Sequence, residues 1–328
     1  MTGNQAAQRL SCPEEERGVY VLDTLYVEPT NRCNLACTTC PRTFFRHDPL
    51  RDITLAELDG LLAEAPAARR LVLHGLGEPL LHADIVEMVR LGTSQGRTVL
   101  FNTNGILMTP ELARSLVAAG LAEYRVSLDM PDPELYPEIR RGGDLAAAYA
   151  GVRMLAEARE AAGSQLPVVS FWMTEGRNRL PHLARLVREA AALDVREVYL
   201  QRLILMDRGE AVPENAVFGK NDPELVEALA EAERTAVELG VRLMGSGNVN
   251  PATRNGDSAA AGDLERRPWS RCTRPFNTTY VTATGNVLPC CLSPFTAAAG
   301  IESCILGNAF EEPLSAIWNG PRYQAFRK

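Results

Sequence analysis

The stretch EPTNRCNLACTTCPR, residues 28–42, places three of the chain's eight cysteines within eight positions. Cys33, Cys37 and Cys40 follow a short apolar run, TLYVEPT (24–30), which has the composition of a buried strand. Loops that follow the strands of a parallel sheet meet at its carboxyl edge, where such sheets bind ligands. Three thiolates on one loop can hold a soft metal centre. The stretch therefore predicts a metal site at the mouth of an α/β fold.

Similar apolar runs recur along the chain, and helix signals separate them. The runs are RLVLHGLG (70–77), TVLFNTNG (98–105), EYRVSLDM (123–130), PVVSFWM (167–173) and EVYLQRLIL (197–205). A capping box at 54–57 begins the first helix, and Thr109-Pro110 and Asp222-Pro223 place a capping side chain before a helical proline. Six βα units of about 30 residues predict a closed or partial barrel or a doubly wound sheet.

Composition and charge exclude several classes of protein. The 328 residues, 46% of them apolar, suffice for one barrel-sized domain or two smaller ones. A net charge of −7 without a basic run, and an aromatic content of 6%, argue against a nucleic-acid partner. No apolar stretch approaches the ~20 residues of a membrane helix, and the N-terminus lacks the apolar core of a secretion signal. We expect a cytoplasmic protein without a disulfide framework.

A second group of cysteines lies near the end of the sequence, whereas Cys12 stands alone. The group consists of Cys272, Cys290, Cys291 and Cys304. It follows a polar stretch, 245–268, which predicts a linker or a lid. The run FNTTYVTATGNVLPCC (276–291) predicts two strands joined by a turn at 283–286, and a helix is expected from about Leu314 to the end. The expected divisions are an N-terminal extension (1–23), a barrel (24–244), the linker or lid (245–268) and a small C-terminal domain (269–328).

The residues alone leave the kind of metal site open. Zinc normally takes four ligands, as two separated pairs or a Cys/His mixture, and His47 is the nearby candidate for a fourth ligand. A [4Fe–4S] cluster on three cysteines leaves one iron free to bind something else. The alternatives are a zinc knuckle or three ordinary buried cysteines.

The spacing Cys33-x3-Cys37-x2-Cys40 after a first strand closely resembles the radical S-adenosylmethionine (SAM) superfamily, over about residues 24–205. The resemblance implies a partial (β/α)6 TIM barrel and a [4Fe–4S] cluster whose open iron is chelated by SAM. It also implies reductive cleavage of SAM to a 5′-deoxyadenosyl radical that abstracts a substrate hydrogen atom. An electron donor such as flavodoxin or ferredoxin is the implied partner. The residue before the third cysteine, often aromatic in the family, is Thr39.

The same resemblance implies a SAM-binding set. Gly75-Leu76-Gly77-Glu78-Pro79 looks like the family's Gly-Gly-Glu-Pro element with Leu76 inserted, which implies that Gly75, Gly77 and Glu78 contact the SAM amino group. Glycines let the backbone approach a ligand closely, although a tight turn explains them equally well. The other implied positions, each with an alternative as a polar strand end or turn former, are Asn102, Thr103, Asn104, Ser127, Asp129 and Gln201.

The spacing Cys272-x12-Gly285-x4-Cys290 resembles the opening of SPASM and twitch domains, which carry auxiliary iron–sulfur clusters. It implies one auxiliary [4Fe–4S] cluster on Cys272, Cys290 and Cys304, with a zinc-stabilised hairpin as the alternative. Cys291 is expected on a strand, where neighbouring side chains point to opposite faces. We therefore predict Cys291 to be either an inert buried thiol or the catalytic hydrogen-atom donor of an epimerase.

The short chain and single auxiliary site resemble enzymes that epimerise or oxidise sugars and aminocyclitols in antibiotic pathways. The expected function is epimerisation of a carbinol carbon in such a small molecule. The alternatives are a dehydrogenase that passes an electron to the auxiliary cluster, a peptide-modifying maturase and a zinc-binding scaffold. A maturase is disfavoured because about 20 residues before the first strand are too few for a leader-binding domain. Candidate substrate contacts are Glu28, Asn31, Arg42, His74, Glu175, Gln201 and Arg202.

Overall fold

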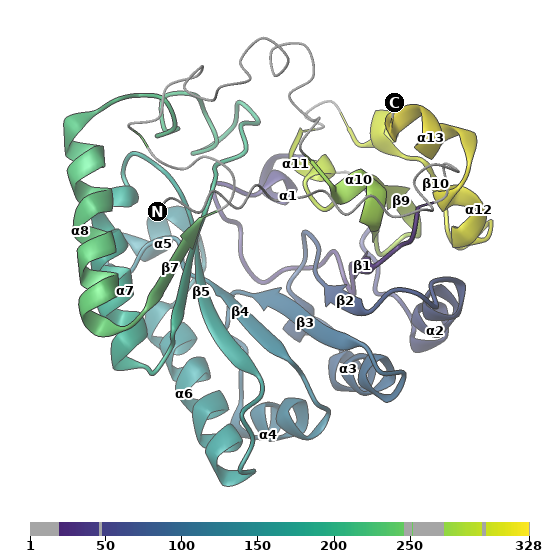
Figure 1. Ribbon diagram of the computed structural model, residues 1–328, viewed down its shortest axis with the longest axis horizontal. Helices are drawn as coiled ribbons and strands as arrows, with labels where there is room; N and C mark the ends of the chain where they lie inside the picture. Colours follow the sequence, from purple (N-terminus) through teal and green to yellow (C-terminus); the bar gives the residue numbers. More distant parts are fainter. Residues whose placement is uncertain (1–19, 46–47, 246–250, 252–271, 297–299, 328) are drawn as a thin grey trace, which may run out of the picture.

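The fold is a curved, mostly parallel sheet with helices on its outer side (Figure 1). The computed structural model describes residues 20–45, 48–245, 251, 272–296 and 300–327. One ten-stranded sheet runs in the order β10-β9-β8-β1-β2-β3-β4-β5-β6-β7. Pairing is parallel from β8 to β7, and the β8–β9 and β9–β10 pairs are antiparallel.

The six predicted βα units are present, and every strand except β5 is shorter than its apolar run. The strands are β1 (Thr24–Val27), β2 (Arg70–Leu73), β3 (Thr98–Thr103), β4 (Glu123–Ser127), β5 (Val168–Thr174) and β6 (Glu197–Gln201). The main helices are α2 (Leu55–Glu64), α3 (Ile85–Ser94), α4 (Pro110–Ala118), α6 (Leu145–Ala161), α7 (Leu183–Ala192) and α8 (Pro223–Leu239). Short helices α1 (Pro41–Phe44) and α5 (Tyr136–Ile139), and 3-10 turns η2 (Pro79–Leu81) and η3 (Leu180–His182), lie in the loops. A strand the sequence did not predict, β7 (Arg242–Gly245), pairs with β6.

The predicted helix caps are confirmed. The Thr54 hydroxyl accepts from the Glu57 N–H, and the Glu57 carboxylate accepts from the Thr54 N–H, which completes the capping box of α2. Thr109 caps α4 and Asp222 caps α8, each directly before a proline. Each cap satisfies an N–H that has no partner within its helix.

The hydrophobic core lies between the sheet and its outer helices. Side chains that alternate along the strands, such as Leu25 and Val27 of β1, are fully buried against this helical layer. Helix residues such as Leu58, Met88 and Val89 complete the packing. Because successive strand side chains point to opposite faces, the remaining positions face the inside of the curved sheet.

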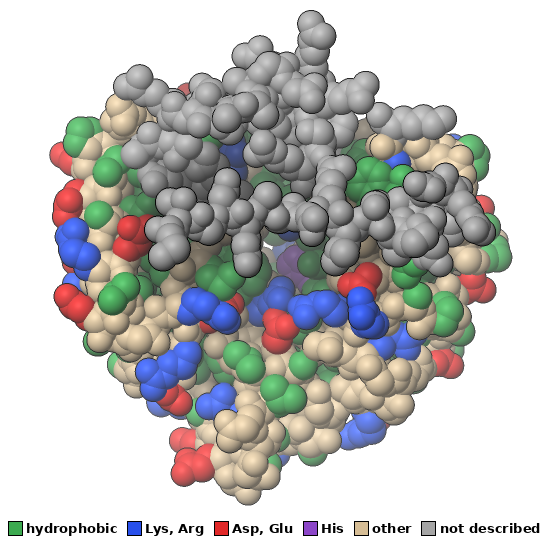
Figure 2. Space-filling model, in the orientation of Figure 1, with side chains coloured by type: hydrophobic (Ala, Val, Ile, Leu, Met, Phe, Trp, Pro, Cys, Tyr) green, Lys and Arg blue, Asp and Glu red, His purple; other side chains and the backbone are tan. Residues whose placement is uncertain are grey.

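The inner face of the sheet is polar and aromatic. Trp172 of β5 stacks on Tyr199 of β6 with ring centroids 4.0 Å apart, and the Arg125 guanidinium lies 4.8 Å from the Trp172 ring. Glu123 pairs with both Arg70 (3.0 Å) and Arg125 (2.6 Å). Figure 2 shows basic side chains, interspersed with acidic ones, in a band across the middle of the molecule. A polar inner face suits a polar ligand better than a sealed core does.

The C-terminal region continues the barrel sheet. Its strand β8 (Thr278–Val281) pairs in parallel with β1, and β9 (Asn286–Leu288) returns beside it after a turn in which Gly285 has φ +87°. The other elements are α10 (Arg274–Asn277), α11 (Ser293–Thr296), η4 (Glu302–Cys304), β10 (Gly307–Asn308), α12 (Leu314–Trp318) and α13 (Pro321–Arg327). The predicted single terminal helix is two helices, because Gly320 and Pro321 interrupt it and proline has no N–H to continue the helical bonding.

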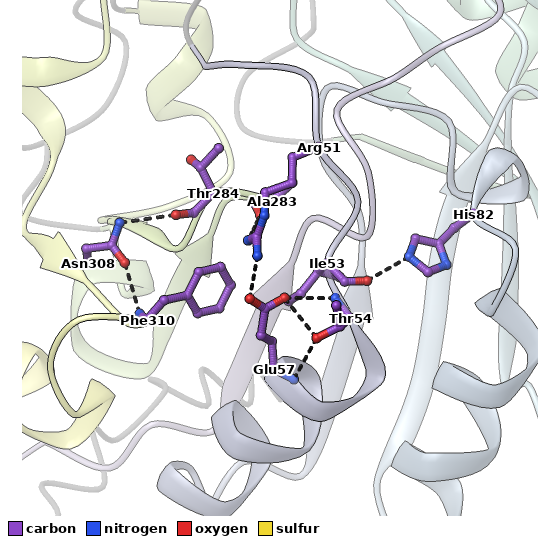
Figure 3. Close-up of polar contacts among 9 residues, drawn as sticks. All are labelled: Arg51, Ile53, Thr54, Glu57, His82, Ala283, Thr284, Asn308 and Phe310. Atoms are coloured by element: carbon purple, nitrogen blue, oxygen red, sulfur yellow. Dashed lines mark hydrogen bonds and ion pairs between the residues drawn. The ribbon is translucent and has the colours of Figure 1, made fainter.

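The turn of this hairpin is docked on Arg51, in the loop before α2 (Figure 3). Arg51 Nη1 donates to the Ala283 carbonyl at 2.7 Å, and its guanidinium pairs with Glu57 and lies 4.9 Å from the centre of the Phe310 ring. Asn308 Nδ2 donates to the Thr284 carbonyl at 3.1 Å and braces the same turn. Glu57, the acidic member of the α2 capping box, thus also holds the side chain that positions the C-terminal hairpin.

Two expectations concern segments that lie largely outside the described residues. Of the predicted linker or lid, 245–268, the structure describes residues 245 and 251, and of the N-terminal extension it describes 20–23. Within the described part of the chain, no helix has both the length and the apolar character needed to cross a membrane.

Candidate active site

The loop that carries Cys33, Cys37 and Cys40 leaves the carboxyl end of β1 and curls around the side chain of Arg42. The Arg42 guanidinium donates to three loop carbonyls, those of Asn31 (3.0 Å), Leu35 (3.1 Å) and Cys33 (3.3 Å). A guanidinium carries its donors in a fixed planar fork, so these bonds set the curvature of the loop. Arg42, a candidate substrate contact from the sequence, is therefore a scaffold of the cysteine loop.

The three thiols lie where a free thiolate is unfavourable. Burial, together with the neighbouring Cys37 sulfur, raises the pKa of Cys40 to about 12, and burial also raises the pKa of Cys33 and Cys37. Bound metal ions supply the positive charge that buried thiolates need. In the described residues, no three His, Cys, Asp or Glu side chains are close enough to hold one ion. Cysteine thiolates are the ligands of [4Fe–4S] clusters, and Cys33, Cys37 and Cys40 would hold one here.

Glu78 connects the loops that follow β2 and β3. Its buried carboxylate accepts from the Thr103 hydroxyl (2.5 Å), the Asn104 N–H (2.8 Å) and the Leu80 N–H (3.1 Å). The Asn104 side chain donates in turn to Asn34 Oδ1 of the cysteine loop at 2.8 Å. Three of the positions implied to bind SAM are thus one hydrogen-bonded unit, in which the Glu78 carboxylate holds its own chain's backbone in place.

The predicted glycine motif is required by close packing. A Cβ atom on Gly77 would lie 2.0 Å from the Thr30 carbonyl oxygen, and one on Gly75 would lie 2.3 Å from the Glu28 side chain. Both glycines therefore let the loop at 75–78 lie directly on the chain that leads to the cysteines. The Glu78 N–H donates to the Arg32 carbonyl at 2.8 Å and closes this contact.

The remaining implied SAM positions lie at strand ends on the same rim. Asn102, Ser127 and Gln201 have half-buried side chains in the last two residues of β3, β4 and β6. Asp129 differs because its carboxylate is buried and already engaged by the chain. It accepts from the Thr174 N–H and pairs with Arg140, each at 2.8 Å. Contact of these four residues with SAM stays a prediction.

Glu28 joins this rim to the C-terminal region. Its carboxylate is 2% exposed, and Oε1 accepts from the Leu76 N–H (2.6 Å) while Oε2 accepts from the Ala283 N–H (3.1 Å). Burial raises the pKa of Glu28 to about 7, against the opposing effect of these backbone hydrogen bonds. Glu28 was expected as a substrate contact, and both of its oxygens instead hold backbone groups from two distant loops.

Three of the C-terminal cysteines lie near Arg274. Burial opposes the charge of this guanidinium, but the sulfurs of Cys291, Cys290 and Cys272 outweigh burial and raise the pKa of Arg274. Cys304 and Cys291 pack against one small apolar cluster. Cys272, Cys290 and Cys304, from separate segments of the chain, are the thiols that would hold the auxiliary iron–sulfur cluster.

One local expectation about Cys291 is wrong. Strand β9 ends at Leu288, and Cys290 and Cys291 lie in the turn that follows it, so strand alternation does not separate their side chains. Pro289, which cannot donate to a sheet ladder, comes directly after the strand. Burial, followed by the charge of Cys290, raises the pKa of the Cys291 thiol to about 12. Cys291 is therefore a neutral thiol at physiological pH, and it packs, as Tyr26 of β1 does, against the apolar cluster that contains Tyr280.

The other candidate substrate contacts differ in how far they are engaged. Asn31 bonds the backbone at 49 and 51, and the Arg202 guanidinium lies 4.4 Å from the Phe218 ring. Burial lowers the pKa of His74 to about 4, and its ring meets Tyr26 edge-on at 6.3 Å. Glu175 is fully buried with Oε2 unpartnered.

Two arginines that turn inward at the barrel mouth were not predicted from the sequence. Arg140 and Arg179 lie beyond the ends of β4 and β5, and the Arg179 side chain is fully buried. Charged residues in loops are common, so a single sequence offers no signal that these two turn inward. Only the stretch IRRGG (139–143), directly before a helix cap, marks a tight turn there.

Two family matches agree with this geometry. Residues 27–173 match the Radical SAM superfamily, and residues 272–328 match an iron–sulfur cluster-binding domain, SPASM. The chain is a radical SAM protein with a C-terminal SPASM domain. Its cofactors are the SAM-binding [4Fe–4S] cluster with SAM, and an auxiliary iron–sulfur cluster in the SPASM domain.

Curated relatives match part of the chain. The AdoMet-dependent heme synthase of Methanosarcina barkeri is 34% identical over 134 residues, which are 40% of this chain and 38% of that protein. Mycofactocin maturase MftC of Mycolicibacterium smegmatis is 31% identical over 159 residues, 48% of this chain and 40% of that protein. The chain thus covers less than half the length of these two relatives.

Solved structures share the fold over nearly the whole chain. Streptococcus suis SuiB bound to its precursor peptide SuiA superposes with a TM-score of 0.74 at 16% identity, covering 100% of this chain and 75% of that one. Native anSMEcpe with bound AdoMet and Cp18Cys peptide gives a TM-score of 0.63 at 15% identity, with 92% and 81% coverage. The partial barrel with a C-terminal hairpin, expected from the sequence, is therefore confirmed.

Proposed function

We propose that this chain is a radical SAM enzyme that abstracts a hydrogen atom from a polypeptide substrate. The observation that carries the proposal is that the Glu28 carboxylate accepts two hydrogen bonds. One comes from the Leu76 N–H of the SAM motif, and the other comes from the Ala283 N–H of the SPASM hairpin. Because β8 also pairs with β1, the cysteine loop and the hairpin form one continuous rim. A substrate bound along this rim meets both metal-binding regions.

When bound, the [4Fe–4S] cluster and SAM supply the 5′-deoxyadenosyl radical that removes the hydrogen atom. The chain's own residues hold the surroundings in place. Gly75 and Gly77 bring the motif loop against the cysteine loop, and Glu78 fixes the backbone after β3. His74 and Tyr26 carry no charge at neutral pH, because burial lowers the pKa of the histidine and raises that of the tyrosine. Such preorganisation orients a substrate before the reaction.

The comparisons support a polypeptide substrate over the sugar or aminocyclitol expected from the sequence. MftC is a maturase, and the SuiB and anSMEcpe structures each hold a peptide. The sugar hypothesis depended on the short N-terminal region and on analogy, and the relatives described above add nothing to it. Flavodoxin or ferredoxin is the proposed one-electron donor.

Cys291 favours epimerisation as the outcome at the substrate carbon. Its neutral thiol packs against the same apolar cluster as Tyr26, whose position in β1 faces the inside of the barrel. After abstraction, the S–H bond breaks, the hydrogen atom forms a C–H bond on the opposite face of the carbon, and a thiyl radical remains. The electron donor and a solvent proton restore that thiol. Dehydrogenation, in which the substrate instead loses a second electron and a proton, is the alternative outcome.

The proposal is tested with anaerobically reconstituted protein, SAM and dithionite in heavy water. The substrates are a library of synthetic peptides and, in parallel, a panel of aminoglycosides. We expect mass spectrometry to find one deuterium in a peptide, and Cys291→Ala to abolish that product while SAM cleavage continues. A peptide two mass units lighter without deuterium means dehydrogenation. Modification of an aminoglycoside but of no peptide contradicts the polypeptide proposal.

A further inference from the structure

The segment 139–141, which follows α5, is hydrogen-bonded along the cysteine loop. The Ala36 N–H donates to the Arg141 carbonyl at 3.0 Å, and the Thr38 N–H donates to the Ile139 carbonyl at 2.9 Å. Cys37 lies between the two donor residues in the cysteine loop, and Arg140 lies between the two acceptor residues in the segment 139–141. The backbone therefore fixes Arg140 opposite the middle cysteine of the loop.

The Arg140 guanidinium lies between that cysteine and a buried carboxylate. Nη1 donates toward Sγ of Cys37 at 3.9 Å, and Nη2 lies 2.8 Å from Asp129 Oδ2. The Arg140 side chain is 11% exposed and that of Asp129 is 1% exposed, so little water screens either charge. The Thr174 N–H donates to the Asp129 carboxylate, so the carboxylate that orients the Arg140 guanidinium is itself fixed in position.

We propose that Arg140 raises the reduction potential of the SAM-binding cluster, and that the Asp129 carboxylate orients it and limits the increase. Reduction adds one electron from the external donor to the cluster, so a fixed positive charge at a ligand sulfur stabilises the reduced state. Hydrogen bonds to cluster sulfurs and local charge are established determinants of cluster potential. The inference depends on the first cluster and is independent of the substrate.

The other charged groups near the loop do not replace Arg140 in this role. Arg42 directs its guanidinium at three loop carbonyls, not at a sulfur. Glu78 and Asp129 are negative and disfavour an added electron. Arg141, the next residue, has the same charge but an exposed side chain, which makes it a matched control.

The test is a potentiometric titration of the reconstituted full chain without SAM, in which electron paramagnetic resonance measures the reduced cluster at each potential. The signal of the first cluster is identified in a parallel sample by its change when SAM is added. We expect Arg140→Met to shift the midpoint to a more negative potential, Arg140→Lys to shift it less, and Arg141→Met to leave it unchanged. Asp129→Asn, which frees the guanidinium, should shift it to a more positive value.

An unchanged midpoint in Arg140→Met at full iron content overturns the inference. If that variant assembles too little cluster, Asp129→Asn decides, and an unchanged or more negative midpoint there overturns the inference equally. A purely structural role of Arg140 would lower the iron content without moving the potential. Failure of the wild-type chain to assemble any cluster on this loop would overturn the proposed function as well, whereas an unmoved midpoint leaves that proposal intact.

Discussion

The Oε2 atom of Glu28 accepts a hydrogen bond from the Ala283 N–H at 3.1 Å across 255 positions of sequence. Arg51 donates to the carbonyl of the same residue at 2.7 Å, so the peptide groups on both sides of Ala283 are held by side chains of the barrel. One buried carboxylate and one guanidinium thereby set where the SPASM hairpin stands relative to the SAM motif. These contacts of Glu28 and Arg51 with Ala283 connect the loops of the barrel mouth to the C-terminal region.

Glu28 makes stability depend on pH. Its pKa is about 7 in the folded chain against an ordinary value of 4.5, so the carboxyl group is more easily protonated when folded. The associated stabilisation is complete below pH 4.5 and is lost as pH rises through 7, a change of about 3 kcal/mol. We predict that Glu28→Gln, which cannot titrate, gains stability relative to the wild type between pH 5 and pH 8.

The measurement is the denaturation midpoint of both proteins at each pH. Glu28→Gln should start below the wild type at pH 5, because an amide offers one acceptor oxygen where the carboxyl group offers two. Exposed Glu87→Gln is the control and should show a constant difference from the wild type. A constant difference for Glu28→Gln as well would mean that the buried carboxyl does not titrate in this range.

Arg51 connects the Ala283 carbonyl of the hairpin to the Glu57 carboxylate of α2, so Arg51→Met should weaken the attachment of the hairpin to the barrel. Leaving the Ala283 carbonyl and Glu57 without this partner should cost about 1–3 kcal/mol of unfolding free energy. Arg90→Met, which removes an exposed arginine that pairs with Glu87 on one helix, should cost well under 1 kcal/mol. Equal losses in urea denaturation would show that the Arg51 contacts are no stronger than a surface pair.

Glu78 should act on SAM binding through the backbone that it fixes. In Glu78→Gln, at least one of the three donors from Leu80, Thr103 and Asn104 loses its acceptor. We expect weaker binding of SAM, because the backbone after β3 is no longer held in one position, and a loss of about 1–3 kcal/mol of unfolding free energy from the unpaired buried donor. Equilibrium binding of labelled SAM measures this, with Glu87→Gln as the control, and unchanged affinity would remove Glu78 from the SAM site.

Cys272, Cys290 and Cys304 should hold the auxiliary cluster. Two four-iron clusters correspond to about eight irons per chain, the composition of [4Fe–4S] centres on thiolates. Cys272→Ala or Cys290→Ala should lower the iron content toward half of the wild-type value and leave SAM cleavage measurable. Cys12→Ala, which belongs to neither group, should leave the iron content unchanged. A wild-type content near half of that value would speak against the auxiliary site.

Local sequence signals predicted the barrel well, since strand runs, caps and the glycine motif each depend on neighbouring residues. The capping box at Thr54 and the turn at Gly285 are examples whose geometry follows from a few side chains. The pairing of β8 with β1 could not be predicted from the sequence, because nothing in either four-residue strand specifies a partner about 250 positions away. Residue types alone cannot reveal register across such a distance.

Some residues of the candidate site could likewise be predicted from the sequence, and others could not. The cysteines and glycines were visible because their spacing is itself the signal. The hydrogen bonds that Glu28 and Glu78 make within the chain could not be predicted, since a carboxylate in a loop looks available for a ligand until its partners are known. Arg140 was missed for the converse reason: its place beside Cys37 is created by backbone contacts between two loops about 100 positions apart.

The measurement that tests the account most directly is formation of 5′-deoxyadenosine by anaerobically reconstituted protein with SAM and dithionite. The wild type should produce it, and Cys33→Ala, Cys37→Ala and Cys40→Ala should each abolish it while circular dichroism shows an intact fold, because the loop lies at the barrel mouth and outside the core. SAM cleavage at the wild-type rate by the triple cysteine variant would contradict the assignment of this loop as the site of radical formation.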